Sequence, residues 1–141
     1  MRGFTLVEAL LSLAIIAIIT GLSAPVYFSY SVKNDFSLAV DAGVRSLRRA
    51  QFLALNNDRD SNWGTYFSTS SITLYNGNNY DARNSGFDEV YLLPGVISST
   101  VADINFTKFS GEPASFASTT IRSSYGDINV IDVNIKGFVD Y

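Results

Sequence analysis

The chain has 141 residues, a formal net charge of −3 and neither cysteine nor histidine. This length suits about one domain. The missing residue types exclude disulfides, thiol nucleophiles, and the commonest general base and metal ligand. Ten basic residues against thirteen acidic ones provide no broad positive field for nucleic acid. The charged fraction of 16% lies below the value of about a quarter that is typical of soluble domains.

The low charge comes from one segment near the amino terminus. No charged residue occurs from Ala9 to Val32, and a helix of that length reaches roughly 36 Å, enough to cross a hydrocarbon core of about 30 Å. Arg2 is the only basic residue before this run, which favours a cytoplasmic amino end. We therefore expect a single-pass protein of the cytoplasmic membrane, with a transmembrane segment over residues 4–32 and an exported part over residues 33–141.

Glu8 lies at the edge of this apolar run. A carboxylate there costs on the order of a few kcal/mol unless it is hydrated, paired or neutralised. Two interpretations follow from the residues alone. Glu8 either sits at headgroup level and is hydrated, or it meets a cation from another chain in the membrane.

The six residues Gly3-Phe4-Thr5-Leu6-Val7-Glu8 and the apolar run that follows them resemble the type IV prepilin signature. The resemblance implies that a prepilin peptidase removes a leader, residues 1–3, by cutting between Gly3 and Phe4, and that it then N-methylates Phe4. It also implies that Glu8 pairs with the terminal ammonium of a neighbouring subunit in the filament. A buried carboxylate favours an opposite charge in low dielectric. The leader departs from the family pattern because it is so short and has a single basic residue.

Gly21 and Pro25 interrupt the apolar run. Proline inside a helix removes a hydrogen bond and clashes with the preceding turn, at a cost of about 3 kcal/mol. We therefore expect a kink or a local helix break at Gly21 and Pro25. In pilin-like proteins, a proline in this region marks a segment that can melt in the assembled filament.

The helical pattern continues over residues 34–56. One side of this segment carries an apolar stripe that should cover a sheet: Phe36, Ala39, Val40, Val44, Leu47, Ala50, Gln51, Ala54 and Leu55. The other side carries the only basic cluster, made of Arg45, Arg48 and Arg49. This cluster is either a solvated face, an intersubunit contact or a phosphate site.

Short alternating runs typical of antiparallel strands follow residue 60. The predicted strands are Trp63 to Ser68, Ser71 to Tyr75, Glu89 to Leu93, Ile104 to Phe109, Thr119 to Ser124, Ile128 to Ile135 and Phe138 to Tyr141. The alternation slips between Val130 and Ile131, and a β-bulge there is the simplest cause. The fold class is thus α+β, with a long amino-terminal transmembrane and amphipathic helix packed on a small antiparallel sheet domain.

The exported part resembles the H-type pseudopilins and FimT-like minor pilins, one branch of the pilin superfamily. The features that match are Asn62-Trp63-Gly64 after an arginine-bearing helix, the hairpin at Ile72 to Gly77, Ile104-Asn105-Phe106 before Gly111, Thr120-Ile121-Arg122, and Val130 to Gly137. The missing cysteines remove the carboxyl-terminal disulfide loop of many major pilins. The absence of cysteine therefore favours a minor pilin or a pseudopilin over a major pilin.

The sequence contains no catalytic constellation and no predicted cofactor or metal site. Asp58 to Asn62 alternates oxygen ligands, but Trp63 replaces the turn glycine of a calcium loop. Asp88 and Glu89 are adjacent, so in a strand they point to opposite faces. No spacing favours Lys33, Lys108 or Lys136 as the base for a Ser or Thr nucleophile. We expect a protein that is not an enzyme.

DNA uptake is an alternative, because some FimT-like proteins bind DNA through basic residues near the carboxyl end. Residues 123–141 carry only Lys136 against Asp127, Asp132 and Asp140, so phosphate binding by this tail is repulsive on balance. The arginine cluster on the helix is the other candidate for phosphate. The sequence makes nucleic acid an unlikely ligand.

These observations predict a structural filament subunit, a minor pilin or pseudopilin of a type IV pilus or a type II secretion-like system. The partners implied by the resemblance are other pilin or pseudopilin subunits, prepilin peptidase and an inner-membrane assembly platform. The subunit would start in the cytoplasmic membrane and end in a surface or periplasmic filament. A major pilin and a DNA-binding minor pilin remain alternatives.

Overall fold

The computed structural model of the chain describes residue 3 and residues 5–141, apart from the side chains of residues 22–26. One helix, α1 (Leu6–Leu55), is followed by two short 3-10 turns and eight strands. The elements after α1 are η1 (Asp58–Asp60), β1 (Trp63–Phe67), β2 (Ser71–Asn76), η2 (Ser85–Phe87), β3 (Glu89–Leu92), β4 (Ile97–Ser99), β5 (Ala102–Phe106), β6 (Ala117–Ser123), β7 (Ile128–Val133) and β8 (Val139–Asp140).

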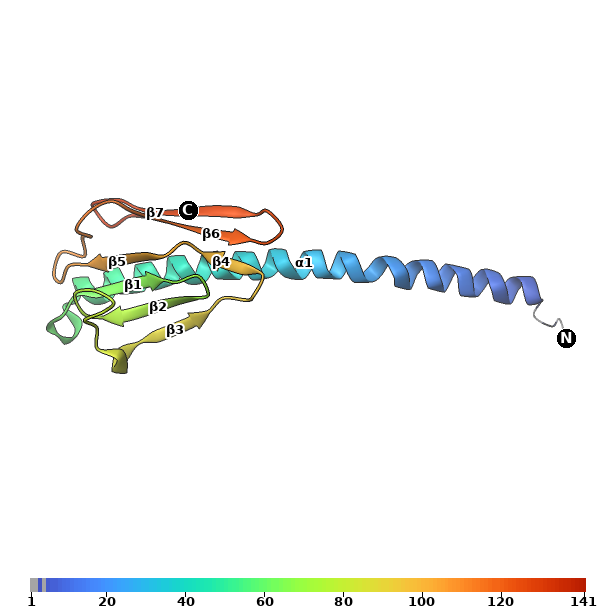
Figure 1. Ribbon diagram of the computed structural model, residues 1–141, viewed down its shortest axis with the longest axis horizontal. Helices are drawn as coiled ribbons and strands as arrows, with labels where there is room; N and C mark the ends of the chain where they lie inside the picture. Colours follow the sequence, from blue (N-terminus) through green and yellow to red (C-terminus); the bar gives the residue numbers. More distant parts are fainter. Residues whose placement is uncertain (1–2, 4) are drawn as a thin grey trace.

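The strands form two four-stranded antiparallel sheets. Sheet A has the order β3-β2-β1-β5, and sheet B has the order β4-β6-β7-β8. Both sheets pack against the carboxyl-terminal half of α1, while its amino-terminal half projects beyond the domain (Figure 1). The predicted α+β class, a long helix on a small antiparallel sheet domain, is confirmed.

The apolar stripe predicted on the second half of α1 is the face that the sheets bury. Val40, Val44 and Leu47 are buried, and the small residues Ala39, Ala50 and Ala54 are fully so. They pack with large side chains from both sheets, among them Phe67, Phe106, Ile121 and Ile131. Leu55 is the exception in the predicted stripe because it is about half exposed at the helix end.

Gly43 allows the two sheets to meet on one helix. A Cβ at this position would lie 3.1 Å from Ile131 Cδ1 of sheet B and 3.2 Å from Phe67 Cε1 of sheet A. These separations are shorter than ordinary van der Waals contacts, so a larger residue would push one sheet away from α1. The helix ends close to residue 56, where the predicted helical pattern stops, since Asn56 is the C-cap and Asn57 has a φ of 51°.

α1 is continuous helix through Gly21 and Pro25. The predicted local unwinding is therefore not present in the isolated chain, and a helix break in an assembled filament stays a prediction. Searched over the described residues, the chain has no helical stretch with the length and hydropathy of a membrane span.

The strand predictions need four corrections. β4 was not predicted, because three residues after Pro94-Gly95 are too few to show a period. β5 and β6 begin two residues earlier than predicted, and β5 ends at Phe106. β7 ends at Val133 rather than Ile135, because the Asn134 side chain turns the chain by accepting hydrogen bonds from the next residues. The predicted β-bulge is wrong, since β7 pairs with β6 without interruption from Ile128 to Val133.

A polar network holds the face of sheet A that points away from α1. The Tyr75 hydroxyl donates to Asp103 Oδ1 at 2.5 Å and accepts from Asn105 Nδ2 at 3.1 Å. Burial, and secondly the hydrogen bond to Asp103, raises the pKa of Tyr75 above its ordinary value. Tyr80 stacks on Tyr66 with ring centroids 3.8 Å apart and covers this face.

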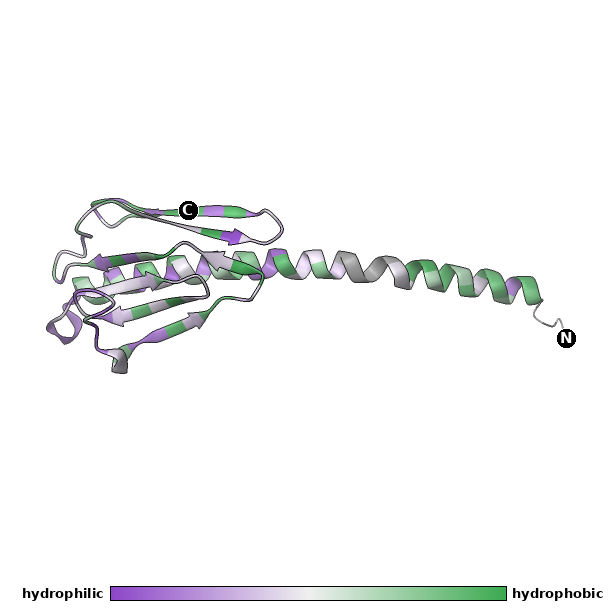
Figure 2. Cartoon of the chain, viewed as in Figure 1, coloured by the Kyte–Doolittle hydropathy of each residue, from purple (hydrophilic) through white to green (hydrophobic). Residues whose placement is uncertain are grey.

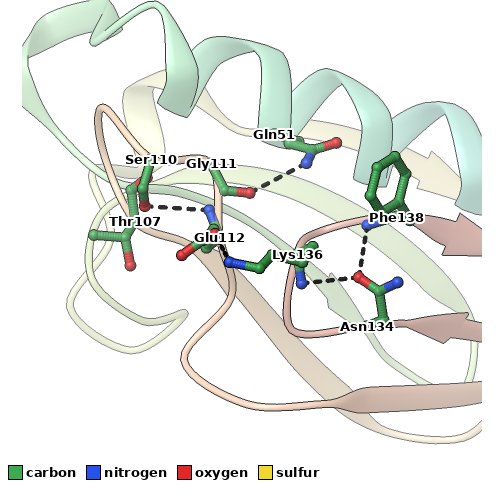
Figure 3. Close-up of polar contacts among 8 residues, drawn as sticks. All are labelled: Gln51, Thr107, Ser110, Gly111, Glu112, Asn134, Lys136 and Phe138. Atoms are coloured by element: carbon green, nitrogen blue, oxygen red, sulfur yellow. Dashed lines mark hydrogen bonds and ion pairs between the residues drawn. The ribbon is translucent and has the colours of Figure 1, made fainter.

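A second network ties the carboxyl-terminal turn to α1 (Figure 3). The Gln51 amide donates to the Gly111 carbonyl at 3.2 Å, and Lys136 Nζ lies 2.9 Å from Glu112 Oε1. Asn134 Oδ1 accepts from the backbone N–H groups of Lys136 and Phe138. These contacts join the segments after β5 and β7 to the helix without a disulfide.

Substitution of Gly64 by alanine should destabilise the domain. Its Cβ would lie 2.4 Å from the ring of the fully buried Tyr75, whose hydroxyl is fixed by two hydrogen bonds. We expect Gly64→Ala to lower the free energy of unfolding by about 1–3 kcal/mol. Urea denaturation of the full chain in detergent, followed by the fluorescence of Trp63, measures this change. Gly95→Ala is the matched control because nothing lies within 4 Å of its added Cβ. Equal stability of the two variants would contradict the packing argument.

Candidate assembly site on the amino-terminal helix

The start of α1 is fixed by a reciprocal pair of residues. Thr5 is the N-cap, and Glu8 is the third residue of the helix. The Glu8 backbone N–H donates to Thr5 Oγ1 at 3.3 Å, while the Thr5 backbone N–H and hydroxyl both donate to Glu8 Oε2, at 3.1 and 3.0 Å. This capping box satisfies backbone donors that would otherwise be unpaired at the helix start.

The Glu8 carboxylate has capacity for a further partner. Oε2 takes both hydrogen bonds from Thr5, and Oε1 accepts none from the part of the chain that the structure describes. Glu8 is exposed and lies in the first turn, where the helix dipole favours a negative charge. The geometry therefore offers a preorganised carboxylate with one oxygen open to a cation from outside.

Apolar side chains surround the first part of the helix, both before and after Glu8. Nine of them are between 50% and 77% exposed: Leu6, Val7, Leu10, Leu11, Leu13, Ile15, Ile16, Ile18 and Ile19. Figure 2 shows this free half of α1 coloured mainly as hydrophobic, in contrast to the mixed colours of the sheets. A helix that is apolar all round is stable only when it is covered, by other helices or by lipid.

Two hydroxyl groups on this part of the helix already have partners within it. Ser12 Oγ donates to the Glu8 carbonyl at 2.8 Å, and Thr20 Oγ1 donates to the Ile16 carbonyl at 2.8 Å. Bonds of this kind remove the cost of burying a hydroxyl in an apolar environment. Glu8 is therefore the one ionisable group on the described surface of residues 6–21.

The predicted site residues fall into three groups in the structure. Gly3 is exposed and precedes the helix, and Phe4, the predicted cleavage and methylation residue, lies outside the described residues. Glu8 is held by the capping box. Gly21 lies in continuous helix with open space around it, and the side chain of Pro25 is outside the description.

Thr5 is the functional residue that the sequence reasoning missed. Its signal was present, because Thr-x-x-Glu before an apolar run is the pattern of a capping box.

The basic cluster is divided among separate partners. Arg45 pairs with Asp41 at 3.2 Å, and Arg49 pairs with Glu89 of β3 at 2.6 Å. Arg48 instead lies over the ring of Tyr141, 5.6 Å from its centroid. Because two of the three arginines have carboxylate partners, the cluster is poorly suited to binding phosphate.

The loop after α1 uses its carboxylates in contacts within the chain. Asp60 Oδ1 lies 2.8 Å from Lys108 Nζ, and this hydrogen-bonded pair lowers the pKa of Asp60 below its ordinary value. Asp88 pairs with Arg83, and Glu89 with Arg49, so these neighbours point apart as predicted. Within the described residues, no three acidic side chains gather as metal ligands would.

Comparison with known families agrees with the geometry at the amino terminus. Residues 1–24 match the family model described as the prokaryotic N-terminal methylation motif. No curated protein and no solved structure matches the chain. The motif supports a type IV pilin-like protein.

Removal of the Thr5 hydroxyl should loosen the first turn of α1. Loss of an N-cap side chain costs about 1 kcal/mol, and here it also removes one of the two hydrogen bonds that Glu8 Oε2 accepts. We expect Thr5→Ala to accelerate amide hydrogen exchange at residues 8–10, measured by NMR on the full chain in detergent micelles. Thr5→Ser, which keeps the hydroxyl, is the control. Unchanged exchange in Thr5→Ala would show that the capping box does not hold the helix start.

Proposed function

We propose that the chain is a structural subunit, a minor pilin or pseudopilin, of a type IV pilus or a type II secretion-like filament. Prepilin peptidase would remove residues 1–3 and methylate Phe4, and an inner-membrane assembly platform would receive the processed subunit. The observation that carries the proposal is the free half of α1, which is apolar on all sides and has one carboxylate at its start. We propose a structural role and no enzymatic one.

One apolar surface would serve the subunit in two environments. Before assembly, the helix would lie in the cytoplasmic membrane, where the apolar run continues through residues 22–26 to Val32. In the filament, the same side chains would pack against the helices of neighbouring subunits. Because lipid and neighbouring helices are similarly apolar, transfer between them needs little change in burial. The domain would remain on the outer side of the membrane throughout.

Glu8 would select the position of each incoming subunit. Cleavage after Gly3 creates an ammonium group at Phe4, and Glu8 Oε1 is free to receive a cation from a neighbour. In an apolar filament core, an unpaired carboxylate is strongly unfavourable. A subunit that placed its ammonium elsewhere would leave Glu8 unpaired, so the charge pair would fix the axial position of neighbouring helices.

A major pilin is the second candidate for the role in the filament. The network of Gln51, Gly111 and Lys136 at the carboxyl-terminal turn performs the tethering that a disulfide provides elsewhere. The absence of cysteine is therefore weak support for a minor role. A DNA-binding role is not favoured, since Arg45 and Arg49 are paired with carboxylates.

Processing can be tested directly by mass spectrometry. We expect the protein from native cells to begin at N-methylated Phe4, and to occur both in the membrane and in sheared surface filaments. High abundance in the filaments would identify a major subunit, and trace amounts a minor one. A chain that keeps Met1 and stays in the membrane would overturn the proposed function.

The charge of Glu8 can be separated from its capping role. Gln at this position can still complete a capping box but cannot neutralise an ammonium. We expect Glu8→Gln to be processed normally and to lose incorporation into filaments by more than about tenfold, because an unpaired buried charge costs about 3–5 kcal/mol. Quantitative mass spectrometry of sheared filaments measures this loss.

Thr5→Ala is the matched control for this experiment, because it disrupts the capping box and keeps the carboxylate. We expect it to reduce incorporation much less than Glu8→Gln does. If Glu8→Gln enters filaments as well as the unaltered chain does, the charge pair is not part of assembly.

A further inference from the structure

Strand β7 is apolar on both of its faces. Ile131 and Val133 point inwards and are fully buried, while Ile128 and Val130 point outwards and are 59% and 46% exposed. The uninterrupted register with β6 rules out a bulge that would bring all four to one face. Strands with apolar residues on both faces are typical of sheets that are covered on both sides. In the isolated chain, only the inner side of β7 has a cover.

The outward side of the β6–β7 hairpin is acidic as well as apolar. We call it the hairpin face and define it by Arg122, Ile128, Val130 and Asp132. Asp132 lies opposite Asp140 of β8 in the pairing register, and Asp127 is in the turn of the hairpin. None of these three carboxylates forms an ion pair with any residue that the structure describes. The hairpin face therefore offers apolar side chains beside unpaired negative charge.

A groove lies on the other flank of the domain, between α1 and the edge strand β3. This edge groove has a volume of about 370 Å³. Its lining includes the apolar residues Leu38, Ile72, Leu74 and Val90, and the charged residues Arg45, Arg49 and Glu89. Arg49 pairs with Glu89 within this lining, whereas Arg45, whose side chain is 76% exposed, has its partner outside it. Its partner Asp41 is an exposed neighbour one helical turn away, so their interaction is weak.

β3 adds a second feature to the edge groove. It pairs with β2 on one side and is the outer strand of sheet A, and all four of its residues are exposed. An exposed edge strand with apolar side chains and no lysine or proline is a surface that favours contact with another chain. Apolar lining, the exposed Arg45 and an open strand edge thus lie together on this flank.

The two surfaces face in opposite directions. In Figure 1, β3 lies at the lower edge of the domain and β7 at the upper edge, with α1 running between them. Subunits anchored by parallel helices in a filament are related by a rotation and a translation along one axis. Such an operation brings one surface of a subunit against a different surface of the next copy. The contact then repeats along the axis without closing into a ring. Opposite flanks with complementary charge and apolar surface are what this symmetry requires.

We propose that the edge groove of one subunit receives the hairpin face of a second copy of this chain. Ile128 and Val130 cover the apolar lining near Leu38 and Val90, and the carboxylates of Asp127 and Asp132 approach Arg45. This inference rests on the second candidate of the proposed function, the major pilin, because only a subunit that is repeated along the filament brings the two flanks of neighbouring copies together.

Cross-linking in assembled filaments tests the contact. The chain has no native cysteine, so introduced thiols are the only reactive ones. We expect the double variant Leu38→Cys with Val130→Cys, treated in sheared filaments with a short bismaleimide, to give a ladder of dimers, trimers and longer oligomers. A head-to-tail contact produces such a ladder, while each single variant gives monomer only. A dimer from Val130→Cys alone would instead indicate a symmetric contact and overturn the proposal.

Val101→Cys combined with Val130→Cys is the matched control. Val101 is exposed like Leu38 but does not line the edge groove, so this pair should give no ladder. Filaments that contain the Leu38 and Val130 double variant but give no ladder, or the same ladder as the control, would overturn the interface and leave the proposed function intact. Failure of the unaltered chain to enter filaments would overturn both.

Discussion

The structure depends on one helix that is buried over half of its length and uncovered over the other half. The carboxyl-terminal half of α1 lies under two sheets, with Ala39, Ala50 and Ala54 fully buried. The first part of the helix, residues 6–21, presents exposed apolar side chains all round. Burial of apolar surface is the largest favourable term in folding and association, so the free half requires a cover that this chain does not supply. The proposed role as a filament subunit follows from that requirement.

The pairing of Thr5 with Glu8 shows how one side chain can serve folding and assembly. Glu8 stabilises the helix start through Oε2 and leaves Oε1 available for an external cation. The capping box therefore orients the carboxylate before any partner arrives, which lowers the entropy that binding has to offset. A single glutamate at the third helical position is compatible with both functions because capping uses a hydrogen bond, while assembly uses the charge.

Like the free half of α1, the domain has apolar surfaces that its own chain leaves uncovered. β7 carries apolar residues on both faces, and β3 leaves an open edge beside a groove with two arginines. The carboxyl-terminal turn, in contrast, is closed by hydrogen bonds to Gln51 and by the pair of Lys136 with Glu112. Polar contacts thus complete this part of the fold internally, while the free half of α1 and the two flanks carry uncovered apolar surface.

The sequence by itself determined the long helix, its buried stripe from Val40 to Ala54, its end at Asn56 and most of the strands, because these features arise from local periodicity and capping. It also contained the amino-terminal motif, which is six consecutive residues. Only the tertiary structure decided the division into two sheets and the three-residue strand β4, since pairing between distant strands is not encoded in local alternation. It also showed Ile128 and Val130 facing outwards. Sequence reasoning placed all apolar residues of that segment on one face by assuming a bulge, whereas the straight register with β6 holds alternate residues on opposite faces. The partners of Arg49 and Tyr75 were likewise set by folding, because each of these contacts joins separate elements, whereas Arg45 and Asp41 pair within one helix.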